Sequence, residues 1–163
     1  MLIAASVASA PATAAPVSIA GMIVFLDPGH NGANDASLTK QVPTGRGGTK
    51  DCQTSGTTAN DGYPEHSFNW ETVLRIRQEL TALGVRTAMS RGDDTSVAAC
   101  VDARADLTGL NLAQYPAVLV ECGNMKNPAD AALLESPEGR QKYADAIVKG
   151  IAGFLGTRPP RTA

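Results

Sequence analysis

The sequence lacks the features that mark several common classes of protein. Lysine and arginine number 14 against 16 acidic residues, and the net charge of −2 offers no basic field for nucleic acid. No run of 18 apolar residues is present, so we expect no membrane span. Repeats and a second domain are also missing. We therefore expect a monomer with one folded domain over residues 21–156, a leader over 1–20 and a tail over 157–163.

Histidine is scarce too, since the chain has only two. One of them, His30, follows an apolar run at residues 22–26 and the turn Asp27-Pro28-Gly29. Ligands collect at the carboxyl ends of strands in open parallel sheets. Pro28 fixes one torsion and Gly29 permits a sharp bend, so the imidazole is aimed by the backbone. This segment alone leaves two readings open, a metal ligand and a solvent-facing turn histidine.

Two carboxylates occupy comparable positions further along the chain. Glu65 lies in the first turn of an amphipathic helix predicted over residues 64–83. It could be a ligand, or simply a partner of the helix dipole. Glu121 ends a predicted strand over residues 117–120, and a buried strand has little reason to end in a charge unless that charge reaches solvent, a partner or a metal.

The order of predicted elements indicates the fold class. Strands are expected at 22–26, 85–89 and 117–120, and helices at 64–83, near 96–105 and after Pro128, with Asn127 and Ser136 as helix starts. Strands that alternate with helices predict an α/β domain. We expect a single mostly parallel, twisted sheet with helices on both faces.

Three segments together resemble a known family. They are residues 26–32 (Leu-Asp-Pro-Gly-His-Asn-Gly), Glu65 with Asn69, and residues 116–121 followed by Gly123 and Asn127. The resemblance is to the zinc-dependent N-acetylmuramoyl-L-alanine amidases, particularly the small mycobacterial type, and covers residues 22–155. It implies that residues 21–156 form a catalytic domain with one Zn²⁺. It also implies hydrolysis of the amide between N-acetylmuramic acid and L-alanine of the peptidoglycan stem peptide.

The resemblance carries over residue by residue. His30 and Glu65 match two zinc ligands, and Glu121 matches the catalytic acid/base. The family's second histidine ligand has no counterpart. His66 is the other histidine, but neighbouring helical residues project about 100° apart, which makes shared coordination with Glu65 awkward. We expect His66 to pack or to donate supporting hydrogen bonds.

The absent ligand points to an absent segment between Ala105 and Asp106. In the family that ligand ends a strand after the helix expected near 96–105. One explanation is a true deletion, giving a catalytically silent domain that binds peptidoglycan or regulates another hydrolase. The other is a stretch omitted from the sequence, which we favour because losing a central strand would leave neighbours about 10 Å apart. A third hypothesis is a metal-free α/β domain for protein contacts, with His30, Glu65 and Glu121 far apart.

The N-terminus and the cysteines bear on location. Residues 1–20 read as an export signal whose basic start is missing, or as an Ala/Pro/Ser leader with no role. Export to the periplasm or cell wall, as for a secreted autolysin, would permit a disulfide between Cys52 and Cys100, although two free thiols remain an alternative. Cys122 is expected to be a small buried side chain rather than a nucleophile.

Overall fold

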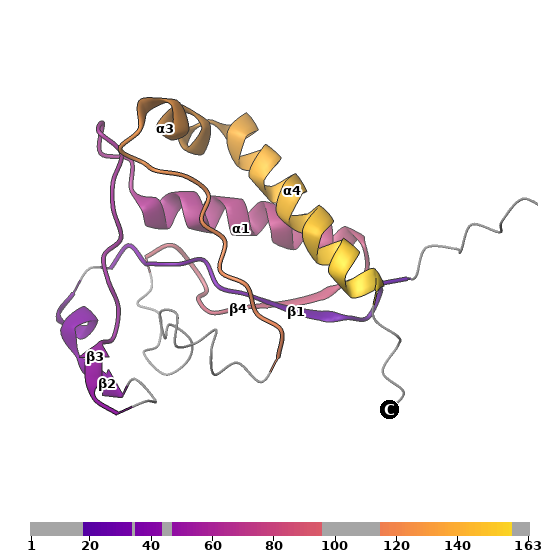
Figure 1. Ribbon diagram of the computed structural model, residues 1–163, viewed down its shortest axis with the longest axis horizontal. Coiled ribbons are helices and arrows are strands. Elements are labelled where there is room, and N and C mark those ends of the chain that lie inside the picture. Colours follow the sequence, from indigo (N-terminus) through magenta and orange to yellow (C-terminus); the bar gives the residue numbers. More distant parts are fainter. Residues whose placement is uncertain (1–17, 34, 44–46, 96–114, 158–163) are drawn as a thin grey trace, which may run out of the picture.

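The computed structural model describes residues 18–33, 35–43, 47–95 and 115–157 of the chain (Figure 1). Its elements in chain order are the strand β1 (Ile23–Leu26), the short 3-10 helix η1 (Ala36–Thr39), strands β2 (Gln41–Pro43) and β3 (Thr49–Asp51), helix α1 (Glu65–Ala82), strand β4 (Arg86–Met89), and helices α3 (Pro128–Glu135) and α4 (Pro137–Gly156).

A β–α–β unit positions the residues that matter for function. β1 and β4 are parallel neighbours, with Ile23 opposite Arg86 and Leu26 opposite Met89. α1 connects them, and Gly84 turns the chain back toward β4 with a φ of 77° that a residue without Cβ adopts readily. The predicted strands at 22–26 and 85–89 and the predicted helix at 64–83 are confirmed within one or two residues.

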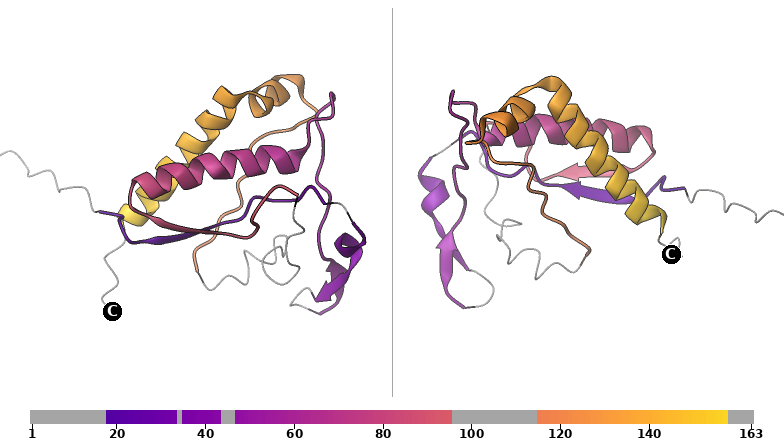
Figure 2. Two further views of the ribbon diagram at one scale, coloured as in Figure 1. Left: turned by 180° about the vertical axis from the view of Figure 1, so that it is seen from behind. Right: turned by 45° about the horizontal axis from the view of Figure 1, so that its top comes forward.

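Helices α1 and α4 lie together on one side of the β1–β4 pair (Figures 1 and 2). The apolar side chains that they bury between them form the main core: Leu26, Ile76, Leu80, Val85, Ala144 and Val148. Each large aliphatic side chain buried in this way contributes about 1.5–3 kcal/mol. The opposite side of β1 carries Ile23 and Phe25, which are 66% and 57% exposed. That side carries no helix within the described part of the chain.

A second cluster anchors α3 beside the start of α1. It contains Phe68, whose ring meets Tyr143 edge-on at 5.7 Å, together with Met125 and Leu134. Asn127 caps α3 by accepting hydrogen bonds from two backbone N–H groups, and the Ser136 hydroxyl caps α4. Both predicted helix starts are therefore confirmed.

The predicted strand at 117–120 is wrong. Residues 115–123 form no regular element, and Val118, Leu119 and Val120 are 77%, 56% and 48% exposed. A strand requires a neighbour for its hydrogen bonds and a partner for its apolar face. Within the described residues β1 pairs with β4 and β2 pairs with β3, so this run has neither.

The α/β class is confirmed, but the sheet is smaller than expected. The described residues hold one parallel and one antiparallel pair of strands, rather than a mostly parallel sheet with helices on both faces. The β2–β3 hairpin lies in a polar stretch for which no strand was expected. The helix predicted near 96–105 falls outside the described residues. None of the helices that the structure describes is long and apolar enough to cross a membrane.

Candidate metal centre

His30 leaves the end of β1 in an unusual backbone conformation. Its φ is 61°, the left-handed region, which costs a residue with a Cβ roughly 1–2 kcal/mol. The flanking Pro28 and Asn31 are fully buried, which holds the turn between them in place. Such strain persists where the surrounding structure determines the conformation, and it is common at functional sites.

Glu65 reaches His30 from the start of α1. Pro64 is the N-cap, with extended backbone, and Glu65 is the first helical residue. The Nε2 atom of His30 and the Oε2 atom of Glu65 are 3.4 Å apart, with the two side chains 15% and 27% exposed. The structure therefore brings together the two side chains that the sequence singled out as metal ligands.

The spacing of this pair fits one small divalent cation. Zinc bonds to nitrogen and oxygen are about 2.0–2.2 Å long, so two ligands of a tetrahedral ion lie about 3.3 Å apart. A histidine and a carboxylate are also ligand types that catalytic zinc sites use. His30 and Glu65 thus have the chemistry and the spacing of two ligands of a zinc ion, which is the metal that the resemblance implies.

The segment from Thr54 to Thr57 orients both side chains. The Nδ1 atom of His30 lies 3.0 Å from the carbonyl oxygen of Thr54, and because a carbonyl only accepts, Nδ1 carries the hydrogen there. This tautomer leaves the lone pair on Nε2, which faces Glu65. The backbone N–H of Thr57 donates to Oε2 of Glu65 at 2.8 Å. The polar stretch at 33–62 therefore borders the site.

Gly56 lies directly against the pair. A Cβ built at this position would sit 2.9 Å from two carbon atoms of the His30 ring and 3.0 Å from Oε2 of Glu65. Its φ is also 75°. Both the contact and the backbone conformation favour a residue without a side chain.

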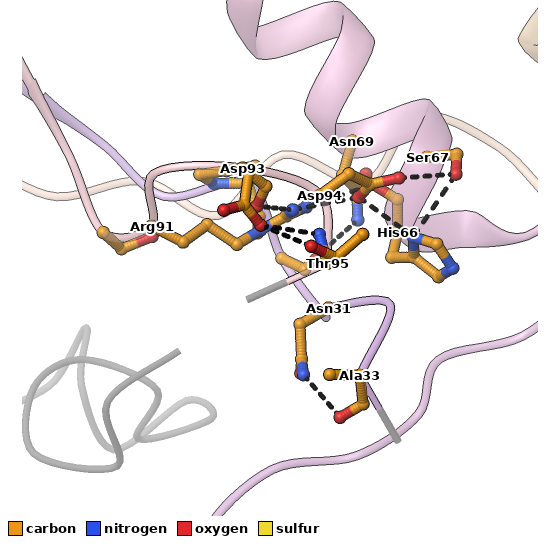
Figure 3. Close-up of polar contacts among 12 residues, drawn as sticks. Asn31, Ala33, His66, Ser67, Asn69, Arg91, Asp93, Asp94 and Thr95 are labelled. Carbon is orange, nitrogen blue, oxygen red and sulfur yellow. Dashed lines mark hydrogen bonds and ion pairs between the residues drawn. The ribbon is translucent and has the colours of Figure 1, made fainter. Parts of the chain in front are cut away.

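A charged network lies beside the start of α1 (Figure 3). The Asp94 carboxylate lies 3.0 Å from Nδ1 of His66 and accepts hydrogen bonds from Ser67 at 2.8 Å and Arg91 at 2.9 Å. Partial burial would raise the pKa of Asp94, but the hydrogen bonds from His66, Ser67 and Arg91 outweigh it and hold the pKa below its usual range. His66 thus makes the kind of supporting hydrogen bond expected of it.

Arg91 and Asp94 were not identified from the sequence. They follow β4, which is the parallel neighbour of β1, so their segment emerges at the same edge of the sheet as His30. The rule that functional groups gather at the carboxyl ends of adjacent parallel strands could have found them.

Glu121 lies on the irregular stretch 115–123 and is exposed. Burial, together with the nearby Glu121 charge, raises the pKa of the Cys122 thiol, which keeps it protonated at neutral pH. Cys122 was expected to be buried but is half-buried, and a protonated thiol is a poor nucleophile. Cys52 is buried, at 2% exposure, whereas Cys100 is outside the described residues, so their pairing stays a prediction.

The part of the chain that the structure describes contains no group of three or more His, Cys, Asp or Glu side chains placed to hold a metal. Glu121 does not join His30 and Glu65 in such a group. Among the described residues, His30 and Glu65 therefore stand as a pair, without a third such side chain beside them.

The fold is an α/β domain whose candidate site, an imidazole at a strand end beside a carboxylate at a helix start, lies at the carboxyl edge of a parallel strand pair, where open α/β sheets bind their ligands. Comparison with protein families identifies the family: the family model described as N-acetylmuramoyl-L-alanine amidase matches residues 24–111 and 98–153. The chain belongs to this family.

Individual relatives agree. The chain is 48% identical to N-acetylmuramoyl-L-alanine amidase Rv3717 of Mycobacterium tuberculosis, over 90% of this chain and 92% of that protein. The crystal structure of the N-acetylmuramyl-L-alanine amidase Ami1 from Mycobacterium smegmatis matches with a TM-score of 0.81 at 50% identity, covering 86% of this chain and 100% of the other. The apo form of Ami1 from Mycobacterium abscessus gives a TM-score of 0.78 at 44% identity, covering 83% and 99%.

The alignment with the Mycobacterium tuberculosis protein is longer than this chain. It runs over 221 positions, whereas the chain has 163 residues. At least 58 positions of the alignment, the difference between those lengths, therefore hold no residue of this chain.

Proposed function

We propose that this protein is a zinc-dependent amidase that hydrolyses the bond between N-acetylmuramic acid and the first L-alanine of the peptidoglycan stem peptide. The observation that carries the proposal is the 3.4 Å approach of His30 Nε2 to Glu65 Oε2, in a chain that belongs to the amidase family. Peptidoglycan or a muropeptide fragment is the partner, and the periplasm or cell wall is the place of action.

In this proposal His30 and Glu65 hold the metal. Bound zinc supplies a water of lowered pKa and polarises the amide carbonyl of the substrate. The Thr54 carbonyl fixes the His30 tautomer, and the Thr57 N–H fixes one oxygen of Glu65. Both contacts prepare the ligands before the metal arrives, because hydrogen-bond partners of ligands set their orientation and basicity.

Glu121 is the proposed acid/base. Its carboxylate accepts a proton from the attacking water and passes that proton to the alanine nitrogen as the carbon–nitrogen bond breaks. The products are the free lactyl carboxylate on the sugar and the free amine of the stem peptide. An exposed position on an irregular segment leaves this side chain open to substrate.

The proposed Cys52–Cys100 disulfide would serve the same site. Cys52 stands two residues before Thr54, whose carbonyl orients His30. A covalent link at Cys52 would restrict the polar segment and so help hold Thr54 and Thr57 against the ligand pair. Export would supply the oxidising environment that the link requires.

A cleavage assay tests the proposal. Purified protein loaded with zinc is incubated with a defined muropeptide, and the free stem peptide is detected by mass spectrometry. We expect release by the wild type and none by His30→Ala. A wild type that binds zinc and releases no stem peptide would overturn the hydrolytic role.

The alternative function is a catalytically silent domain that binds peptidoglycan or regulates another hydrolase. It is favoured by the pair having only two ligands among the described residues and by the 58 or more alignment positions without a counterpart. We propose that the alignment positions without a counterpart fall between Ala105 and Asp106 of this chain. We also propose that these positions supply the second histidine ligand of the family, which this chain lacks.

An insertion experiment separates the two functions. The intervening residues of the Mycobacterium tuberculosis relative are placed between Ala105 and Asp106, and the two proteins are compared. If the present chain is silent, it binds muropeptide without cleaving it, and the insertion restores both zinc and turnover. Equal turnover with and without the insertion would exclude the silent reading.

A further inference from the structure

We propose that Arg91 is a positioning residue that fixes the distance between His30 and Glu65. The inference rests on the proposed metal-binding role of that pair. The Arg91 side chain donates hydrogen bonds to the backbone of both segments that carry the proposed ligands.

The guanidinium group joins three segments of the chain (Figure 3). Nε donates to the carbonyl of Pro28 at 3.1 Å, two residues before His30. Nη2 donates to the carbonyl of His66 at 3.1 Å, one residue after Glu65. Nη1 donates to the Asp94 carboxylate at 2.9 Å and to the carbonyl of Asp93 at 2.8 Å. One rigid planar group thus spans the His30 turn, the start of α1 and the end of β4.

The surroundings of Arg91 hold its guanidinium group in one orientation. Its side chain is fully buried and its guanidinium lies 4.8 Å from the ring centroid of Trp70 on α1. A buried charge is tolerated only when it is paired and hydrogen-bonded, so rotation away from these acceptors is strongly disfavoured. Lysine could not replace it, because an ammonium group lacks the planar fork that reaches several acceptors at once.

A second side chain holds the neighbouring carbonyl of the same turn. Asn69 on α1 donates from Nδ2 to the carbonyl of Gly29 at 2.9 Å. The two carbonyls that precede His30 are therefore each held by a side chain, and His30 itself stays in the left-handed conformation at φ 61°. Because that conformation is unfavourable on its own, the turn depends on these two hydrogen bonds.

Arg140 on α4 provides a matched control. Taken as a whole residue, Arg140 is similarly buried, at 6% exposure against 5% for Arg91. It also pairs with a carboxylate, Glu71 at 2.7 Å, donates to the carbonyl of Leu134 at 3.1 Å and lies 5.9 Å from the Tyr63 ring centroid. None of these groups belongs to the His30 turn.

The experiment compares the wild type, Arg91→Lys and Arg140→Lys in the full chain by three measurements. The first is the zinc dissociation constant, by competition with a chromophoric chelator. The second is urea unfolding without metal. The third, also without metal, is the nuclear Overhauser effect between the His30 ring and the Gly56 α protons, which are adjacent in the structure.

We expect Arg91→Lys to weaken zinc binding by about 10–100-fold, the usual effect of removing a group that orients a ligand. The Overhauser effect should weaken in the same variant. Arg140→Lys should lower the urea midpoint to a similar extent while leaving zinc affinity within about twofold and the Overhauser effect unchanged.

Two results would overturn the inference. One is an Arg91→Lys protein whose Overhauser effect matches the wild type; the other is an equal loss of zinc affinity in both variants. If the wild type binds no zinc, the proposed metal chemistry fails, and the metal-free Overhauser effect alone then decides the role of Arg91.

Discussion

The Nε2 atom of His30 and the Oε2 atom of Glu65 lie 3.4 Å apart although they come from a strand end and a helix start. The same short segment orients both, through the Thr54 carbonyl and the Thr57 N–H. The pair is therefore prepared by backbone groups, and its geometry should survive changes on the protein surface. The predictions below test the two side chains, their support and the proposed acid/base.

Removing either proposed ligand should abolish metal binding. We expect His30→Ala and Glu65→Gln each to reduce bound zinc from about one per chain to near zero, because a catalytic site has only three protein ligands. Metal content is measured by atomic emission after dialysis. His66→Ala is the control and should retain zinc, since its Nδ1 is engaged with Asp94. Zinc retained in His30→Ala would refute the assignment.

Glu121→Gln should separate binding from chemistry. The amide keeps the size of the side chain but cannot accept a proton from water, so turnover should fall by about 10²–10⁴-fold. Zinc content should stay unchanged, because Glu121 is not a proposed ligand. The check is a single-turnover muropeptide assay on zinc-loaded protein, and turnover within about twofold of the wild type would contradict the role.

Gly56→Ala should displace the His30–Glu65 pair, in addition to straining the backbone at position 56. The new methyl group would lie 2.9 Å from the His30 ring, so either the ring or the segment that carries residue 56 must move. Gly62→Ala is the matched control, since its φ of 99° is also positive but no atom lies within 4 Å of the added carbon.

Both glycine variants should lose about 1 kcal/mol or more of unfolding free energy through the unfavourable backbone conformation. Only Gly56→Ala should also weaken zinc binding. Urea unfolding and chelator competition measure the two effects, and equal zinc affinity in the two variants would show that Gly56 has no special contact.

Because of Asp94, the free energy of unfolding should depend on pH in the acid range. Its pKa is lower in the folded protein than in the unfolded chain, where it is about 3.9. The unfolded state therefore binds a proton first, so the stabilisation is present above about pH 4 and is lost as the pH falls through the folded pKa.

Asp94→Asn should cost about 1.5–3 kcal/mol at pH 7, because the variant loses hydrogen bonds to a charged acceptor. The difference from the wild type should shrink when unfolding is measured near pH 3. A difference that is the same at both pH values would contradict the assigned cause.

The local structure around the proposed ligands could be predicted because short-range rules govern it. The apolar run before His30, the proline before Glu65 and the capping residues Asn127 and Ser136 each act on neighbours in sequence. The 3.4 Å approach of His30 to Glu65 was implied only by the family resemblance. Spacing alone does not determine it.

The failures come from interactions between distant segments. The run at 117–120 has strand composition, but composition supplies no partner strand, and Val118 is 77% exposed. The position of Arg91 after a parallel strand could have been recognised from the sequence, but its hydrogen bonds could not, because most of its acceptors are backbone carbonyls, those of Pro28, His66 and Asp93.

The most direct test of the central claim is an anomalous diffraction map of zinc-soaked crystals, recorded above and below the zinc absorption edge. We predict one strong peak within about 2.0–2.2 Å of both His30 Nε2 and Glu65 Oε2. A map with no peak between these two atoms, or with zinc bound only elsewhere, would contradict the claim.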